Sequence, residues 1–132
     1  MNQFRPASYN PATKEILFNR TFLVNNPKGF IQEHRRRGNL STGVSNHVNV
    51  HEYLHGYSWS MWSNGKTGAQ QLISLLEKET GKKWEDIAKT ISERARENEN
   101  ELFSEIGTMA WNGISRKSNK VYVDIARRFL GL

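Results

Sequence analysis

The stretch SNHVNVHEYLHGYSWSMW, residues 45–62, decides the fold class. Its large side chains recur at intervals of three or four residues, at Val48, His51, His55, Trp59 and Trp62. Apolar residues such as Val50 and Leu54 fall between these positions. Helical spacing with apolar residues on more than one side predicts a helix that is buried on two faces.

The chain after this stretch continues the helical pattern. Thr67 is a suitable N-cap for a helix that Gly81 ends. Amphipathic segments follow over residues 84–95 and 102–111, as one bent helix or two, and Gly113 ends them. Ser118 is expected to start a last helix. No stretch alternates with a period of two, so we predict an all-α fold with an antiparallel four- or five-helix bundle over residues 45–132.

The four tryptophans fall at positions where the helical pattern expects core side chains. They are Trp59, Trp62, Trp84 and Trp111. The alternative for the first two is a platform on which single-stranded bases stack.

The first 44 residues are expected to form an arm rather than a core. Asn10-Pro11 marks a helix start, because Asn is a good N-cap and Pro suits the first helical position. Asn26-Pro27 ends that helix. A second short helix over residues 28–37 ends at Gly38, and the loop at 38–46 connects the arm to the bundle.

Positive charge is concentrated at the front of the chain. The net charge is +6, of which residues 1–50 contribute +5, from seven basic and two acidic groups. Arg35-Arg36-Arg37 would fan across about 200° of a helix, so one internal carboxylate cannot pair all three. This distribution indicates a nucleic-acid-binding arm.

The basic residues predict contacts to phosphates. The expected nucleic-acid-binding residues are Arg5, Lys14, Arg20, Lys28, Arg35, Arg36 and Arg37, with Arg116 and Lys117 as a second cluster. A flexible arm holds the backbone without reading bases, so binding is expected to be independent of sequence. Seven phosphate contacts would give a log–log salt slope of about −6.

One short motif carries a second possible chemistry. His51-Glu52-Tyr53-Leu54-His55 matches the His-Glu-x-x-His pattern of zinc peptidases, with two imidazoles on one helical face and a glutamate beside them as base. A third ligand would have to be His47, Glu77 or Glu79. Alternatively, His51 and His55 pack at the bundle edge or face a neighbouring chain. No nucleophile–base pair or carboxylate dyad has diagnostic spacing, so no enzyme, cofactor or metal site is the leading expectation.

Composition narrows the setting of the protein. The chain has 132 residues and no cysteine, which predicts one domain without disulfides. No apolar run approaches about 18 residues, and residues 1–10 lack the apolar core of a signal peptide, so neither a membrane span nor an export signal is expected.

The arrangement of a proline-broken basic arm before a helical bundle resembles the major coat proteins of rod-shaped and filamentous archaeal viruses. The resemblance implies a structural virion protein that packages double-stranded DNA, held in the A form, and assembles into a helical filament. It also implies self-association or pairing with a paralogous coat subunit, and is compatible with a surrounding lipid envelope. Arg20, Lys28, Arg35, Arg36 and Arg37 would face the DNA, and assembly would take place in the host cytoplasm.

Two alternatives of other classes remain open. One is a small viral regulator or inhibitor that binds nucleic acid or a host protein as a discrete monomer or dimer. The other is a zinc-dependent hydrolase that uses His51, Glu52 and His55.

Overall fold

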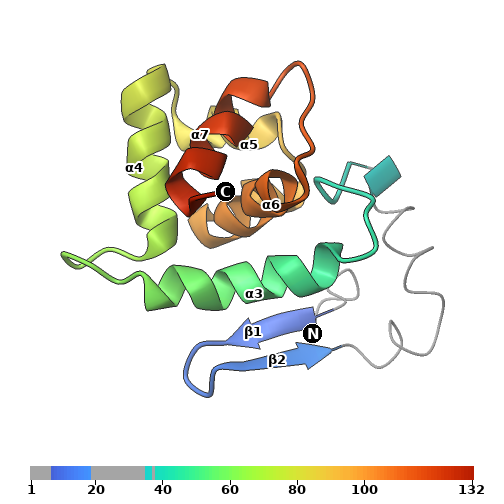
Figure 1. Ribbon diagram of the computed structural model, residues 1–132, viewed down its shortest axis with the longest axis vertical. Helices are drawn as coiled ribbons and strands as arrows, with labels where there is room; N and C mark the ends of the chain where they lie inside the picture. Colours follow the sequence, from blue (N-terminus) through green and yellow to red (C-terminus); the bar gives the residue numbers. More distant parts are fainter. Residues whose placement is uncertain (1–6, 19–34, 37) are drawn as a thin grey trace.

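The computed structural model describes residues 7–18, 35–36 and 38–132 (Figure 1). Five α-helices form the body: α3 (His47–Ser60), α4 (Gly68–Thr80), α5 (Trp84–Lys89), α6 (Glu99–Asn112) and α7 (Lys120–Leu130). The body is a helical bundle, which confirms the all-α prediction. No helix among the described residues has the length and apolar character needed to cross a membrane.

Helix α6 is the centre of the bundle. Every residue from 101 to 110 is buried, and α3, α4 and α7 all pack against this helix. Gly107 allows α3 to approach closely, because a Cβ there would lie 2.6 Å from Leu54 Cδ1. Polar side chains on the facing sides of α3 and α6 are therefore brought within bonding distance.

The ends of two helices follow the predicted signals. Thr67 accepts a hydrogen bond from the Gln70 backbone in a capping box, and Gly81 ends α4 with φ 70°. Gly113 likewise ends α6 with φ 66°.

The segment at residues 84–95 is not one helix, as the apolar spacing had suggested. Helix α5 ends at Lys89, and a 3-10 turn, η1 (Arg94–Arg96), follows. The Arg116 guanidinium donates to the carbonyl oxygens of Thr90 and Ile91, and Asn119 Nδ2 also donates to Thr90. These side chains satisfy carbonyls that a longer helix would have bonded. The last helix begins at Lys120, not at Ser118.

The prediction of a helix starting at Asn10-Pro11 is wrong over the described residues. Strands β1 (Ala7–Asn10) and β2 (Glu15–Phe18) form an antiparallel hairpin there. Asn10 Oδ1 accepts from the backbone of Ala12, and Lys14 takes a left-handed φ of 58°. Asn and Pro suit a tight turn as well as a helix start, and here they make the turn. Most of the second predicted helix, residues 28–37, lies outside the described residues.

The loop at residues 38–46 is bonded to the bundle. The backbone N–H groups of Glu93 and Arg94 donate to the carbonyls of Gly38 and Asn39. Ser41 is buried and donates to Glu105 from both its backbone N–H and its hydroxyl. This segment therefore belongs structurally to the bundle.

The expectation that the tryptophans fill the core is wrong for three of them. Trp59, Trp62 and Trp111 are 43–57% exposed, whereas Trp84 packs partly buried against the core. Smaller side chains, among them Leu72, Leu76 and Phe103, occupy the centre. Helical spacing shows which side chains share a helix face. It does not show how far each of them lies from the central helix, and therefore which are buried.

Candidate metal centre

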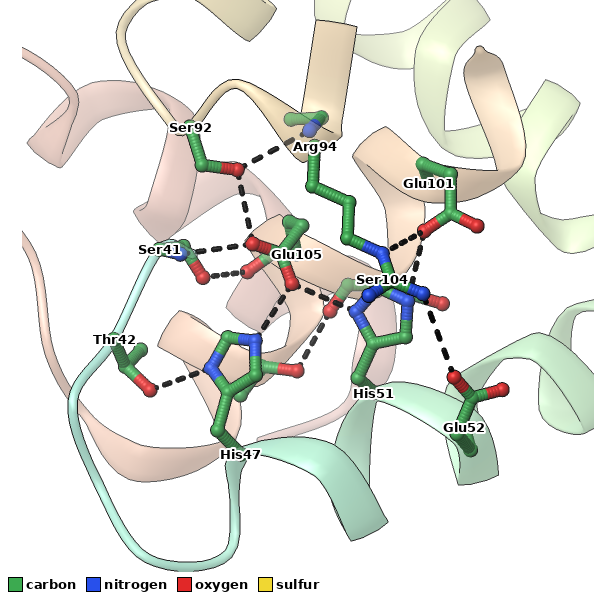
Figure 2. Close-up of polar contacts among 12 residues, drawn as sticks. Ser41, Thr42, His47, His51, Glu52, Ser92, Arg94, Glu101, Ser104 and Glu105 are labelled. Atoms are coloured by element: carbon green, nitrogen blue, oxygen red, sulfur yellow. Dashed lines mark hydrogen bonds and ion pairs between the residues drawn. The ribbon is translucent and has the colours of Figure 1, made fainter. Parts of the chain in front are cut away.

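Two facing rows of ionisable side chains lie between α3 and α6. His47, His51 and His55 follow one another at intervals of four residues on α3, and Glu101 and Glu105 have the same interval on α6. Side chains four residues apart share one helical face. Figure 2 shows His47 and His51 directed toward Glu101 and Glu105 across the helix contact.

Three donor atoms converge at one end of these rows. His51 Nε2 lies 2.8 Å from Glu101 Oε2 and 3.1 Å from His55 Nε2. His55 Nε2 lies 3.3 Å from Glu101 Oε1. His51 and His55 thus present the same ring nitrogen to one carboxylate.

The spacing of these atoms fits a zinc ion. Zinc binds His nitrogen and carboxylate oxygen at about 2.0–2.2 Å, so neighbouring ligand atoms of a tetrahedral site are about 3.3 Å apart. Two histidines and one glutamate are also the ligand set of a catalytic site that keeps its fourth position open. The residues present therefore fit the ion that the His-Glu-x-x-His motif predicts.

Glu105 fixes the orientation of the first ligand. Its carboxylate is fully buried, and Oε2 lies 2.7 Å from both His51 Nδ1 and His47 Nε2. Oε1 accepts from the backbone of Ser41 and the hydroxyl of Ser92. If His51 bound a metal through Nε2, a carboxylate on Nδ1 would orient the ring for it, as the outer shell of metal sites does.

Glu52, the glutamate of the motif, lies beside the ring nitrogens of His51 and His55, and one of its carboxylate oxygens has no hydrogen-bond partner. Its side chain is 2% exposed, and Oε2 has no hydrogen-bond partner. Oε1 lies 3.7 Å from a terminal nitrogen of Arg94, whose Nε donates to Glu101 Oε2 at 3.1 Å. Buried carboxylate oxygens are seldom left without a partner, so this oxygen is an unusual feature of the cluster.

The charged groups of the cluster shift one another's pKa values. Burial acts to raise the pKa of Glu101, but hydrogen bonds from His51 and His55 and the Arg94 charge hold it well below its usual range. Burial and Arg94 act to lower the pKa of His51, yet its bonds to Glu101 and Glu105 raise it to about 9. Without a metal, His51 thus carries a proton on each ring nitrogen.

Acidic groups predominate in the described part of this cluster. The pKa values of Glu101 and Glu105 are held well below their usual range, and the guanidinium that pairs with Glu101 is that of Arg94. Buried carboxylates of this kind favour a nearby cation, because buried charge without compensation is expensive.

A cleft connects this centre to the surface. It has a volume of about 220 Å³, and Glu52, His55 and Glu101 lie along it with Tyr9 and Trp59. Strand β1 lies between β2 and α3 (Figure 1), so the hairpin forms one side of the cleft. A strand next to the motif was not predicted, because Asn10-Pro11 was interpreted as a helix start.

No protein-family model, curated protein or solved structure matches this chain. The assignment therefore rests on geometry.

The sequence offered His47, Glu77 or Glu79 as a third ligand, and the structure places Glu101 against His51 and His55 instead. His47 lies with His51 and Glu105 in a second group that has metal-ligand spacing. His47 lies between Thr42 Oγ1 and Glu105. Glu77 accepts from the backbone of Trp84, and Glu79 pairs with Arg128. The signal that was missed is the four-residue interval between Glu101 and Glu105, which matches the interval of the histidines. The expectation that His51 lies at the bundle edge was also wrong, since His51 is buried.

The predicted nucleic-acid residues are only partly described. Lys14 and Lys117 are exposed, and so is Arg36. Burial and the Arg35 cation lower the pKa of Arg116. Four predicted residues lie outside the described part of the chain: Arg5, Arg20, Lys28 and Arg37.

Proposed function

We propose that this protein is a zinc-dependent hydrolase of amide bonds. The observation that carries the proposal is the convergence of His51 Nε2, His55 Nε2 and a Glu101 carboxylate beside the unbonded oxygen of Glu52. The proposal favours the zinc-hydrolase alternative from the sequence analysis over the expected role as a structural virion protein.

Each residue has a defined task in this chemistry. His51, His55 and Glu101 would hold the ion, which when bound supplies Lewis acidity and lowers the pKa of water. Glu52 accepts a proton from the attacking water while the oxygen of that water forms a bond to the amide carbon. The same carboxyl then gives that proton to the departing nitrogen as the C–N bond breaks, so that one water yields an acid and an amine. Glu105 keeps His51 in the required tautomer.

An extended peptide is the substrate that suits the cleft. Strand β1 pairs with β2 on one edge, and the described sheet has no further strand. The remaining edge of β1 lies toward α3 (Figure 1). That edge packs against α3, so the side chains that line the cleft, rather than a free strand edge, would contact an extended chain.

The test combines metal content with turnover. Purified full-length protein should contain one zinc per chain by elemental analysis, and should cleave a mixed peptide library until a chelator removes the ion. Glu52→Gln should retain the zinc but lose roughly 100-fold or more of the rate, the usual contribution of a general base. Glu85→Gln, an exposed glutamate on α5, is the matched control. Absence of stoichiometric zinc, or full activity of Glu52→Gln, would rule the proposal out.

The DNA-packaging role stays a prediction. Arg35 and Arg116 influence one another electrostatically, and Arg116 donates to the carbonyls that follow α5. The zinc centre does not depend on either residue, so the two roles can be tested separately.

A further inference from the structure

The cleft beside the metal centre has a composition that selects among substrates. It is lined by the ionisable side chains of Glu52, His55 and Glu101 and by the apolar side chains of Tyr9, Pro11 and Trp59. The polar residues Asn98 and Asn100 complete it. Ionisable side chains and apolar side chains therefore line the same small cleft.

Trp59 lies one helical turn after His55, so both side chains project from the same face of α3. Its ring stacks on Trp62, with centroids 6.5 Å apart and planes 4° from parallel. The stacking restrains the ring, yet 43% of Trp59 remains exposed. When a ligand covers a large, restrained apolar surface, the burial of that surface makes the binding free energy more favourable.

Tyr9 is held against the same part of α3. A Cβ on Gly56 would lie 3.0 Å from the Tyr9 ring, so the absence of a side chain at Gly56 is what lets the ring pack there. Tyr9 and His55 both line the cleft, so the Tyr9 ring shares that space with the candidate metal centre. The hairpin therefore supplies a second aromatic wall at a fixed position.

We infer that this cleft binds an aromatic or large aliphatic substrate side chain next to the scissile bond, with Trp59 and Tyr9 as the specificity-determining residues. The inference rests on the proposed hydrolase function and names its substrate class. A small side chain would leave the Trp59 surface exposed to water. An acidic side chain would approach the carboxylates of Glu52 and Glu101.

The test uses two zinc-chelating peptide hydroxamates that differ in one side chain, benzyl or methyl, at the position next to the chelating group. Their dissociation constants are measured by calorimetry on the zinc-loaded full-length protein. The benzyl compound should bind about tenfold more tightly, the value expected for partial burial of a phenyl ring. Cleavage sites in a peptide library, read by mass spectrometry, should show the matching preference.

Trp59→Ala should reduce the benzyl advantage to about twofold or less while zinc content stays at one per chain, since Trp59 contributes apolar surface and no metal ligand. Trp111→Ala, another exposed tryptophan but on α6 and away from the cleft lining, should keep the full advantage. Equal binding of both compounds to zinc-loaded wild type, or an advantage that survives Trp59→Ala, would overturn the inference and leave the hydrolase proposal standing. If neither compound binds and no zinc is present, the hydrolase proposal fails and the inference fails with it.

Discussion

His55 is the ligand whose removal gives the clearest test of the metal centre. Its side chain is 13% exposed, against 3% for His51 and 5% for Glu101, so truncation disturbs the core least. Its described bonds are the contacts to His51 and Glu101. His55→Ala should therefore fold, and should lose zinc affinity by more than the roughly 10–100-fold that the loss of an outer-shell partner costs.

The size of the effect follows from linkage. Zinc at about 100 times its dissociation constant stabilises the native state by about 2.7 kcal/mol. Unfolding of this 132-residue chain has an entropy of about 0.28 kcal/mol/K, so the wild-type Tm should rise by about 10 °C. A 100-fold loss of affinity leaves about 0.4 kcal/mol, or a shift of 1–2 °C, for His55→Ala.

The assay is thermal unfolding followed by circular dichroism, with and without zinc at one fixed free concentration. Asn49→Ala, an exposed position on α3, serves as the control and should keep the full wild-type shift. A wild-type Tm that zinc leaves unchanged, or an equal shift in His55→Ala and wild type, would refute the assignment of His55 as a ligand.

Two further predictions test the metal centre and the arm separately. Glu105→Gln should lower zinc affinity about 10–100-fold, because the carboxylate on His51 Nδ1 is lost. The affinity is measured by competition titration against a chromophoric chelator, and an unchanged affinity would contradict the orienting role of Glu105. Arg36→Ser combined with Arg37→Ser should lower the log–log salt slope of duplex-DNA binding by about 2 without changing zinc content; an unchanged slope would argue against phosphate contacts at these residues.

The helical body was predictable because its signals are local. Thr67, Gly81 and Gly113 act on their own helix ends, and the sequence alone specifies those contacts. The early end of α5 depends on Arg116 and Asn119, which lie more than twenty residues away, so the local pattern wrongly extended that helix. The hairpin was not predicted for another reason: Asn10-Pro11 fits a turn and a helix start equally well.

The candidate site shows the same division between local and distant information. His51, Glu52 and His55 are adjacent on one helix, and the motif identified them directly. Glu101 comes from a different helix, 46 residues after His55, and it reaches the site because Gly107 lets α6 approach Leu54. Only the packing of the two helices reveals which carboxylate completes the set.

Folding alone does not account for this cluster. Replacing a buried set of charges by apolar side chains is often neutral or stabilising, so a bundle of this size gains little by burying Glu52, Glu101, Glu105 and Arg94 together. The cluster is also incomplete, since Glu52 Oε2 and one terminal nitrogen of Arg94 have no hydrogen-bond partner. A purely structural network would be expected to satisfy these atoms. Glu52 also lines the cleft together with His55 and Glu101, so its unpaired oxygen belongs to a side chain at the candidate site.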